Sequence, residues 1–103
     1  MHAVSVRPVR WVSDEPQPGL VEVELTDADG HRWSFIDKCA IFSADWTEPS
    51  HPPSTAGIRC TVVGPIDAPV VTIDTSRPDS VESTDGMSTF RVPLQALSPI
   101  DPA

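Results

Sequence analysis

The chain has 103 residues, of which 39% are hydrophobic and 21% are charged, and its formal net charge is −8. This length matches one domain with one core, and the apolar content is high enough for the chain to fold. No apolar run approaches the roughly 18 residues that span a bilayer. The acidic balance and the lack of a basic stripe argue against direct binding to nucleic acid.

The N-terminal segment and the cysteines bear on the compartment. Residues 1–7 lack the charged and apolar regions of a signal peptide, so we expect a cytoplasmic protein with reduced thiols at Cys39 and Cys60. A single lysine, Lys38, stands against six arginines, which suggests a high-GC genome. The chain therefore looks like a small bacterial protein.

Apolar residues recur with a period of two along most of the chain, which is typical of β-strands. In the first strand, Val4 and Val6 lie on one face, whereas Val9 and Trp11 follow the opposite phase. A β-bulge near Pro8 would account for the change of phase, because proline is tolerated at bulges.

The clearest strand pair surrounds the sequence Asp-Ala-Asp-Gly at residues 27–30. A two-residue loop would turn the wrong faces inward. A three-residue loop over residues 28–30 sets Leu25 opposite Trp33 and Val23 opposite Phe35, with glycine at the position that needs a positive φ. We therefore predict a three-residue hairpin.

The second half contains a long proline-rich loop at residues 45–57, then strands near residues 58–62 and 69–74. A second hairpin is predicted around Asp85 and Gly86, with a two-residue loop that sets Val81 opposite Phe90. Prolines limit residues 92–97 to a single helical turn.

These elements predict one all-β domain over residues 1–103, built from six or seven short strands with at most one short helical turn. A small antiparallel barrel is favoured over a β-sandwich, because so short a chain has little material for two full sheets.

Sequence patterns for common chemistry are missing. The turn at residues 27–30 lacks the further ligands of a calcium loop, and the cysteines and histidines match no zinc spacing. No nucleophile motif and no phosphate-binding glycine loop occurs. We therefore expect no metal site, no cofactor and no identifiable catalytic residue.

The candidate binding site is a cluster on the proline-rich loop, formed by Asp45, Trp46, Glu48 and His51. A tryptophan on a stiff polar loop is typical of an interface anchor, because it is large, carries an N–H donor and loses little entropy on binding. Trp46 could instead fold back and cover the open end of the barrel.

Two hypotheses follow. The first is a protein-interaction or accessory module, such as an inhibitor or immunity-type protein, that engages a basic partner through acidic faces and the loop around Trp46. Strand edges could also pair to give a homodimer. The alternative is a small-ligand-binding barrel or minor enzyme with its site at the barrel mouth. An exposed Trp46 would indicate the first, and a closed apolar pocket the second.

Overall fold

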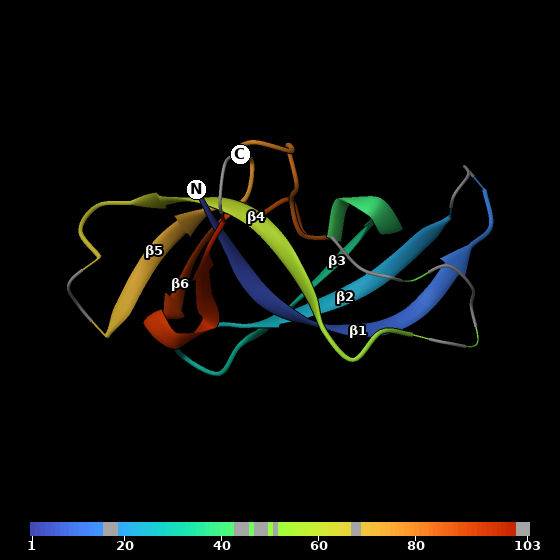
Figure 1. Cartoon of the computed structure of the whole chain (residues 1–103), viewed down its shortest axis with the longest axis horizontal. Coiled ribbons are helices and arrows are strands. Elements are labelled where there is room, and N and C mark those ends of the chain that lie inside the picture. The colour runs from blue at the N-terminus through green and yellow to red at the C-terminus, as the bar shows by residue number, and fades with distance from the viewer. Residues whose placement is uncertain (16–18, 43–45, 47–49, 51, 67–68, 101–103) are drawn as a thin grey trace.

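The computed structural model describes residues 1–15, 19–42, 46, 50, 52–66 and 69–100. The fold is all-β, as predicted, and its seven antiparallel strands form a strongly curled half-barrel sheet (Figure 1). The strands are β1 (His2–Ser13), β2 (Leu20–Thr26), β3 (Arg32–Lys38), β4 (Ala56–Val63), β5 (Val70–Asp74), β6 (Thr89–Pro93) and β7 (Leu97–Pro99). None of the described helices has the length and apolar character needed to cross a membrane.

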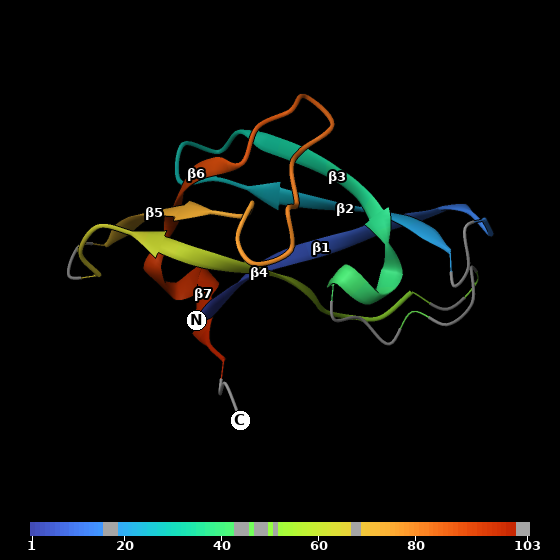
Figure 2. The ribbon, with the colours of Figure 1, turned by 90° about the horizontal axis from the view of Figure 1, so that it is seen from above.

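The long strand β1 organises the sheet. The strands follow the order β3-β2-β1-β4-β5-β6, and β7 also pairs with β1. The first residues of β1 pair with β4 and β7, whereas its later residues pair with β2. Figure 2 shows β1 running diagonally through the molecule between these two groups of strands. One strand therefore holds both halves of the curled sheet together.

The predicted bulge in β1 is confirmed. The pairing of β1 with β2 shifts between Pro8 and Arg10, so that Val9 is the extra residue. A second shift falls between Trp11 and Ser13. The first bulge moves the inward-facing positions from the even residues Val4 and Val6 to the odd residue Trp11, and Val9 itself is exposed.

The predicted register of the first hairpin is also confirmed. Leu25 pairs with Trp33 and Val23 pairs with Phe35. The N–H of Asp27 donates to the carbonyl of His31 over 2.8 Å, and the N–H of Gly30 donates to the carbonyl of Asp27 over 3.1 Å. Gly30 has a φ of +81°, as the closing residue of a three-residue loop requires.

The predicted second hairpin is wrong in its pairing. Phe90 pairs with Ile73, and β6 therefore lies against β5 instead of against the segment around Val81. The turn at Ser83 is not a two-residue loop either, because its N–H donates to the carbonyl of Met87. Val81 and Phe90 are nevertheless both buried, so the assignment of the two side chains to the core is confirmed.

Two turns close the half-barrel where β3 approaches β6. The N–H of Ala28, in the turn before β3, donates to the carbonyl of Arg91 in β6. The N–H of Thr84, in the turn before β6, donates to the carbonyl of Ser34 in β3. Between them, the ring of Phe90 lies 5.3 Å from that of Trp33, centroid to centroid. The turn before β3 is thus bonded to β6, and the turn before β6 is bonded to β3.

Two short 3-10 turns interrupt the strands, one more than predicted. The turn η2 (Leu94–Ala96) is the helical turn predicted for the tail. The turn η1 (Cys39–Phe42) directly follows β3. Its first and last residues, Cys39 and Phe42, are buried. The strand β4 begins at Ala56, so the final two residues of the predicted loop belong to it.

Candidate functional site

The predicted site centres on Trp46, whose side chain is 2% exposed and belongs to the hydrophobic core. Its ring meets that of Trp11 edge to face, with centroids 6.1 Å apart and an interplanar angle of 68°. Edge-to-face pairs of this kind are a favoured aromatic geometry. The Trp46 ring therefore packs inward, as the covering arrangement requires, and does not extend as an exposed anchor.

Trp11 is held in turn by its surroundings. Its indole Nε1–H donates to the Oδ1 atom of Asp14 over 2.9 Å. Gly19 packs so closely against the ring that a Cβ atom there would lie 2.3 Å from Trp11 Cζ2. The Gly19 carbonyl also accepts a hydrogen bond from the N–H of Cys39 over 3.0 Å. Asp14 and Gly19 thus fix the position of the Trp11 ring, against which Trp46 packs.

The indole N–H of Trp46 is buried and has no hydrogen-bond acceptor among the described residues. The other three members of the predicted cluster, Asp45, Glu48 and His51, lie outside those residues. The structure therefore positions Trp46 alone, and the binding role of the cluster stays a prediction.

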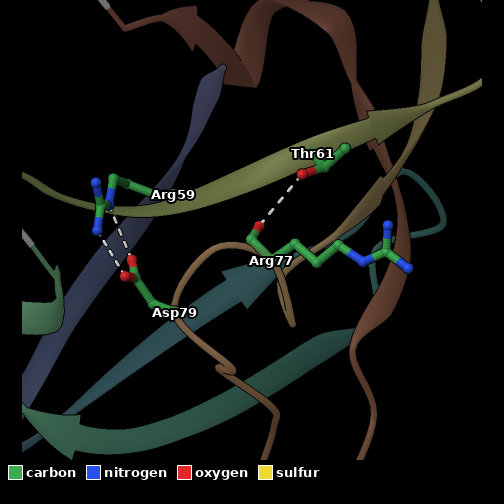
Figure 3. A network of polar contacts seen from close by, with 4 residues as sticks. All are labelled: Arg59, Thr61, Arg77 and Asp79. Atoms are coloured by element: carbon green, nitrogen blue, oxygen red, sulfur yellow. Dashed lines mark hydrogen bonds and ion pairs between the residues drawn. The ribbon is translucent and has the colours of Figure 1, made fainter. Parts of the chain in front are cut away.

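A second candidate region, which sequence reasoning did not single out, is the connection between β5 and β6. It runs beside β4 and is fixed there by hydrogen bonds (Figure 3). The guanidinium of Arg59 donates through Nε and Nη2 to the two carboxylate oxygens of Asp79, over 2.9 and 2.6 Å. The Thr61 hydroxyl donates to the carbonyl of Arg77 over 3.4 Å. The Arg77 side chain extends away from the Arg59–Asp79 pair.

The base of this connection is buried. The Thr75 hydroxyl is fully buried and donates to the carbonyl of Val81 over 2.8 Å. Asp74 accepts hydrogen bonds from the Ser76 hydroxyl and backbone N–H, and these lower the pKa of its carboxyl. The connection is therefore an ordered structure with Glu82 and Asp85 exposed upon it.

Most of the arginines lie in surface ion pairs, whereas several carboxylates outside these pairs face solvent. Ion pairs with described carboxylates engage four of the six arginines. The pairs are Arg7–Glu24, Arg10–Glu22, Arg59–Asp79 and Arg91–Asp29, with N–O distances of 2.8, 2.6, 2.6 and 3.5 Å. Glu22 and Glu24 are thus neutralised by β1, whereas other carboxylates, such as those of Asp14, Glu15, Glu82 and Asp85, are exposed. Four of the six arginines are therefore engaged by carboxylates of the same chain, and these further carboxylates add to the negative charge of the surface.

The cysteines are buried, and the acidic turn bonds to its own backbone. Cys39 and Cys60 are buried free thiols, and burial raises the pKa of Cys60 to about 11. In the turn before β3, the Asp27 carboxylate accepts hydrogen bonds from the Trp33 indole and from two backbone N–H groups. Among the described residues, no three histidine, cysteine or acidic side chains group in a way that could hold a metal ion.

Comparison with known proteins adds no relative. No protein-family model, curated protein or solved structure matches the chain. Function must therefore be argued from the surface and the core described above.

Proposed function

We propose that the chain is a small protein-interaction module, of the inhibitor or immunity-like accessory type, that binds a basic protein partner. The observation that carries the proposal is the distribution of charge. Four arginines are paired with carboxylates of the same chain, while the net charge is −8 and further carboxylates on two separate loops are exposed. A field of one sign attracts partners of the opposite sign and accelerates their association.

The exposed carboxylates that support this proposal lie on structured parts of the chain. Glu82 and Asp85 stand on the connection that Arg59 and Asp79 fix to β4 (Figure 3). Because this connection is already ordered, less conformational entropy is lost when a partner binds to it. This connection is therefore the described region best suited to present negative charge to a basic surface.

Within the proposal, the proline-rich loop contributes through its polar residues Asp45, Glu48 and His51. Trp46 has a different part, because a side chain that is 2% exposed cannot contact a partner without leaving the core. It would hold the loop against the domain through its contact with Trp11.

A cytoplasmic location and a bacterial origin belong to the same proposal. Two free thiols suit a reducing compartment. The excess of arginine over lysine suits a high-GC genome. The alternative function, a ligand-binding barrel or minor enzyme, requires a closed apolar pocket, and no pocket forms within the described part of the chain. We therefore do not base the proposal on it.

The test is a pull-down from the native host, with recovered proteins identified by mass spectrometry. The variant combines Glu82→Gln and Asp85→Asn, which removes two exposed charges from one connection. Arg77→Gln is the matched control, because it removes an exposed positive charge from the same connection and makes the chain more acidic.

We expect the wild type to recover a basic protein whose yield falls at high salt and in the double variant, and holds or rises in Arg77→Gln. Recovery that ignores both salt and these substitutions would contradict an electrostatic interface.

A further inference from the structure

One face of the sheet carries a charge opposite in sign to that of the whole chain. Side chains alternate between the two faces of a strand, and Val23 in β2 and Phe35 in β3 belong to the core. The opposite face of β1, β2 and β3 therefore points outward. We call it the basic face, defined by Arg7, Arg10, Arg32, Ser34, Ile36 and Lys38.

The strand register places these residues next to one another. Paired residues of neighbouring antiparallel strands lie on the same face of a sheet, with Cβ atoms about 5 Å apart. Arg32 and Lys38 lie at the two ends of β3. The four cations of the face therefore border a patch that contains two glutamates, a serine and an isoleucine. The register gives this patch two rows across the strands, Arg7–Glu24–Ser34 and Arg10–Glu22–Ile36.

The arginines of the basic face are much more exposed than the glutamates with which they pair. The Arg7 and Arg10 side chains are 68% and 59% exposed, whereas those of Glu24 and Glu22 are 19% and 16% exposed. Arg7 donates to its glutamate through Nη2, and Arg10 donates through Nε. A guanidinium has five N–H donors, so each arginine keeps further donors for an acceptor from solvent or from a partner.

The other two cations, Arg32 and Lys38, are exposed as well. Within the described part of the chain, no carboxylate forms an ion pair with either of them. The basic face thus holds four of the seven Lys and Arg residues of the chain, against the two glutamates. At physiological salt, exposed charges more than about 8 Å apart are largely screened, so a group that docks on this face responds to its local positive charge.

An apolar side chain lies among these charges. Ile36 is 38% exposed, and Lys38 follows it on the same face of β3. Protein interfaces commonly have an apolar centre within a polar rim, and arginine is enriched in them. The basic face has both features.

We propose that the basic face is a second interaction surface, which binds an acidic segment of another protein whose carboxylates flank an apolar side chain. The carboxylates would accept hydrogen bonds from the exposed guanidinium and ammonium groups, and the apolar side chain would cover Ile36. Nucleic acid fits this face less well, because Glu22 and Glu24 lie between the cations and would repel a continuous row of phosphates.

This surface goes beyond the proposed function, because it lies away from the acidic connection between β5 and β6. Val81 of that connection and Phe42 of η1 belong to the core, toward which the inner face of the sheet points. Figure 1 shows the connection and η1 on the same side of β1, β2 and β3. The chain would therefore present surfaces of opposite charge on opposite sides.

Fluorescence anisotropy with labelled probes tests the proposal. The main probe is a peptide of repeated Glu-Leu-Glu units, its control carries Gln in place of Glu, and an oligothymidylate serves as the nucleic-acid probe. The variants are Arg32→Gln and Lys38→Gln, with Arg77→Gln on the connection as the matched control. Each substitution removes one exposed positive charge, so the three variants have the same net charge and differ in where the charge was lost. Circular dichroism with thermal melting checks that each variant is folded.

We expect the wild type to bind the Glu peptide at low salt. The dissociation constant should rise about two- to fivefold with Arg32→Gln or Lys38→Gln, as the loss of one exposed charge pair predicts. Arg77→Gln should leave it nearly unchanged. Ile36→Ser should weaken the binding without changing its dependence on salt, because it removes an apolar contact and no charge.

Several results would overturn the proposal. Equal weakening by Arg77→Gln would show that the net charge alone governs binding. Equal affinity for the Gln peptide, or no binding of the Glu peptide at low salt, would also contradict it. Tighter binding of the oligothymidylate, weakened by Arg32→Gln and Lys38→Gln, would assign the face to nucleic acid instead.

The variants also separate this inference from the proposed function. Glu82→Gln combined with Asp85→Asn should weaken binding to a basic partner without weakening binding to the Glu peptide. Arg32→Gln should have the reverse effect. Each proposal can therefore fail while the other stands.

Discussion

Replacing Gly19 with alanine tests whether the two tryptophans pack as the structure shows. Gly19 has a φ of +137°, which L residues rarely adopt. The added Cβ atom would lie 2.3 Å from Cζ2 and 2.9 Å from Cη2 of Trp11. Because real Cβ atoms essentially never approach other atoms below 3.0 Å, the Trp11 indole must move, and the ring of Trp46 is in contact with it.

The expected loss of stability has two parts. Holding a residue with a Cβ atom at positive φ costs about 1–2 kcal/mol. Forcing an extra methyl group into a packed site costs about 1–3 kcal/mol. The Gly19→Ala variant should therefore lose about 2–5 kcal/mol of unfolding free energy.

Gly30→Ala is the matched control for the backbone part alone. Gly30 has a φ of +81°, and a Cβ atom there would meet nothing within 4 Å. It should lose about 1–2 kcal/mol. Urea unfolding followed by tryptophan fluorescence gives both values, and near-ultraviolet circular dichroism reports the packing of the indole rings. Combining Gly19→Ala with Trp11→Phe should relieve the clash, because the atoms that it involves are then absent.

Equal losses for the two glycine variants would refute this reasoning. So would an unchanged near-ultraviolet spectrum for Gly19→Ala, since the Trp11 indole could not then have moved.

Two further predictions concern the acidic turn and a buried thiol. Burial raises the pKa of Asp27, but hydrogen bonds from the Trp33 indole and two backbone N–H groups outweigh this and lower it. A lowered pKa stabilises the fold above the unfolded value of about 4, and this part is lost as the pH falls through the folded value. Asp27→Asn should therefore flatten the decline of stability in acid. Ser83→Ala removes the equivalent acceptor, which does not titrate, and should lower stability equally at every pH. Urea unfolding between pH 2 and pH 7 measures this, and parallel curves of unfolding free energy against pH for Asp27→Asn and the wild type would contradict the prediction. The Cys60 thiol is fully buried with its pKa raised to about 11, so a thiol reagent at pH 8 should modify it in denaturant and not in the native protein, and rapid native labelling of Cys60, identified by peptide mass spectrometry, would contradict its burial.

The first hairpin could be predicted because both of its arms show alternation. Val21, Val23 and Leu25 on one arm, and Trp33 and Phe35 on the other, leave a three-residue loop as the choice that buries both sets. The arm before the second turn has no alternating pattern against which its register could be checked, because Val81 is the single apolar residue in the stretch 79–83. The inward face of this arm was therefore assigned from one side chain, and a two-residue loop agreed with that assignment by chance.

A signal for the second turn was nevertheless present. Ser83 precedes Asp85 and Gly86 with the same spacing by which Asp27 precedes Asp29 and Gly30. In the structure, the Ser83 hydroxyl oxygen accepts hydrogen bonds from the N–H groups of Asp85 and Met87, over 3.2 and 3.0 Å. In the first turn, the Asp27 carboxylate accepts the equivalent two hydrogen bonds, from the N–H groups of Asp29 and His31. Side chains that bond to the backbone two residues on are a recognised turn chemistry, and this would have identified both loops as three-residue turns.

The candidate site was harder to predict because a tryptophan within an aperiodic loop has no alternation to fix its direction. Trp46 is flanked by polar residues on both sides, and this pattern is compatible both with an exposed anchor and with a ring turned inward. Its direction depends on Trp11, about 35 residues earlier in the chain, and on the space that Gly19 leaves free. Contacts of this range come from the folded sheet and cannot be read from local pattern.

The closure of the half-barrel likewise comes from contacts that strand periodicity does not report. Ala28 and Thr84 occupy the same position in their two turns, and each donates its backbone N–H across the opening, to Arg91 and to Ser34. These hydrogen bonds satisfy carbonyls on two edge strands that would otherwise be open to pairing with another chain.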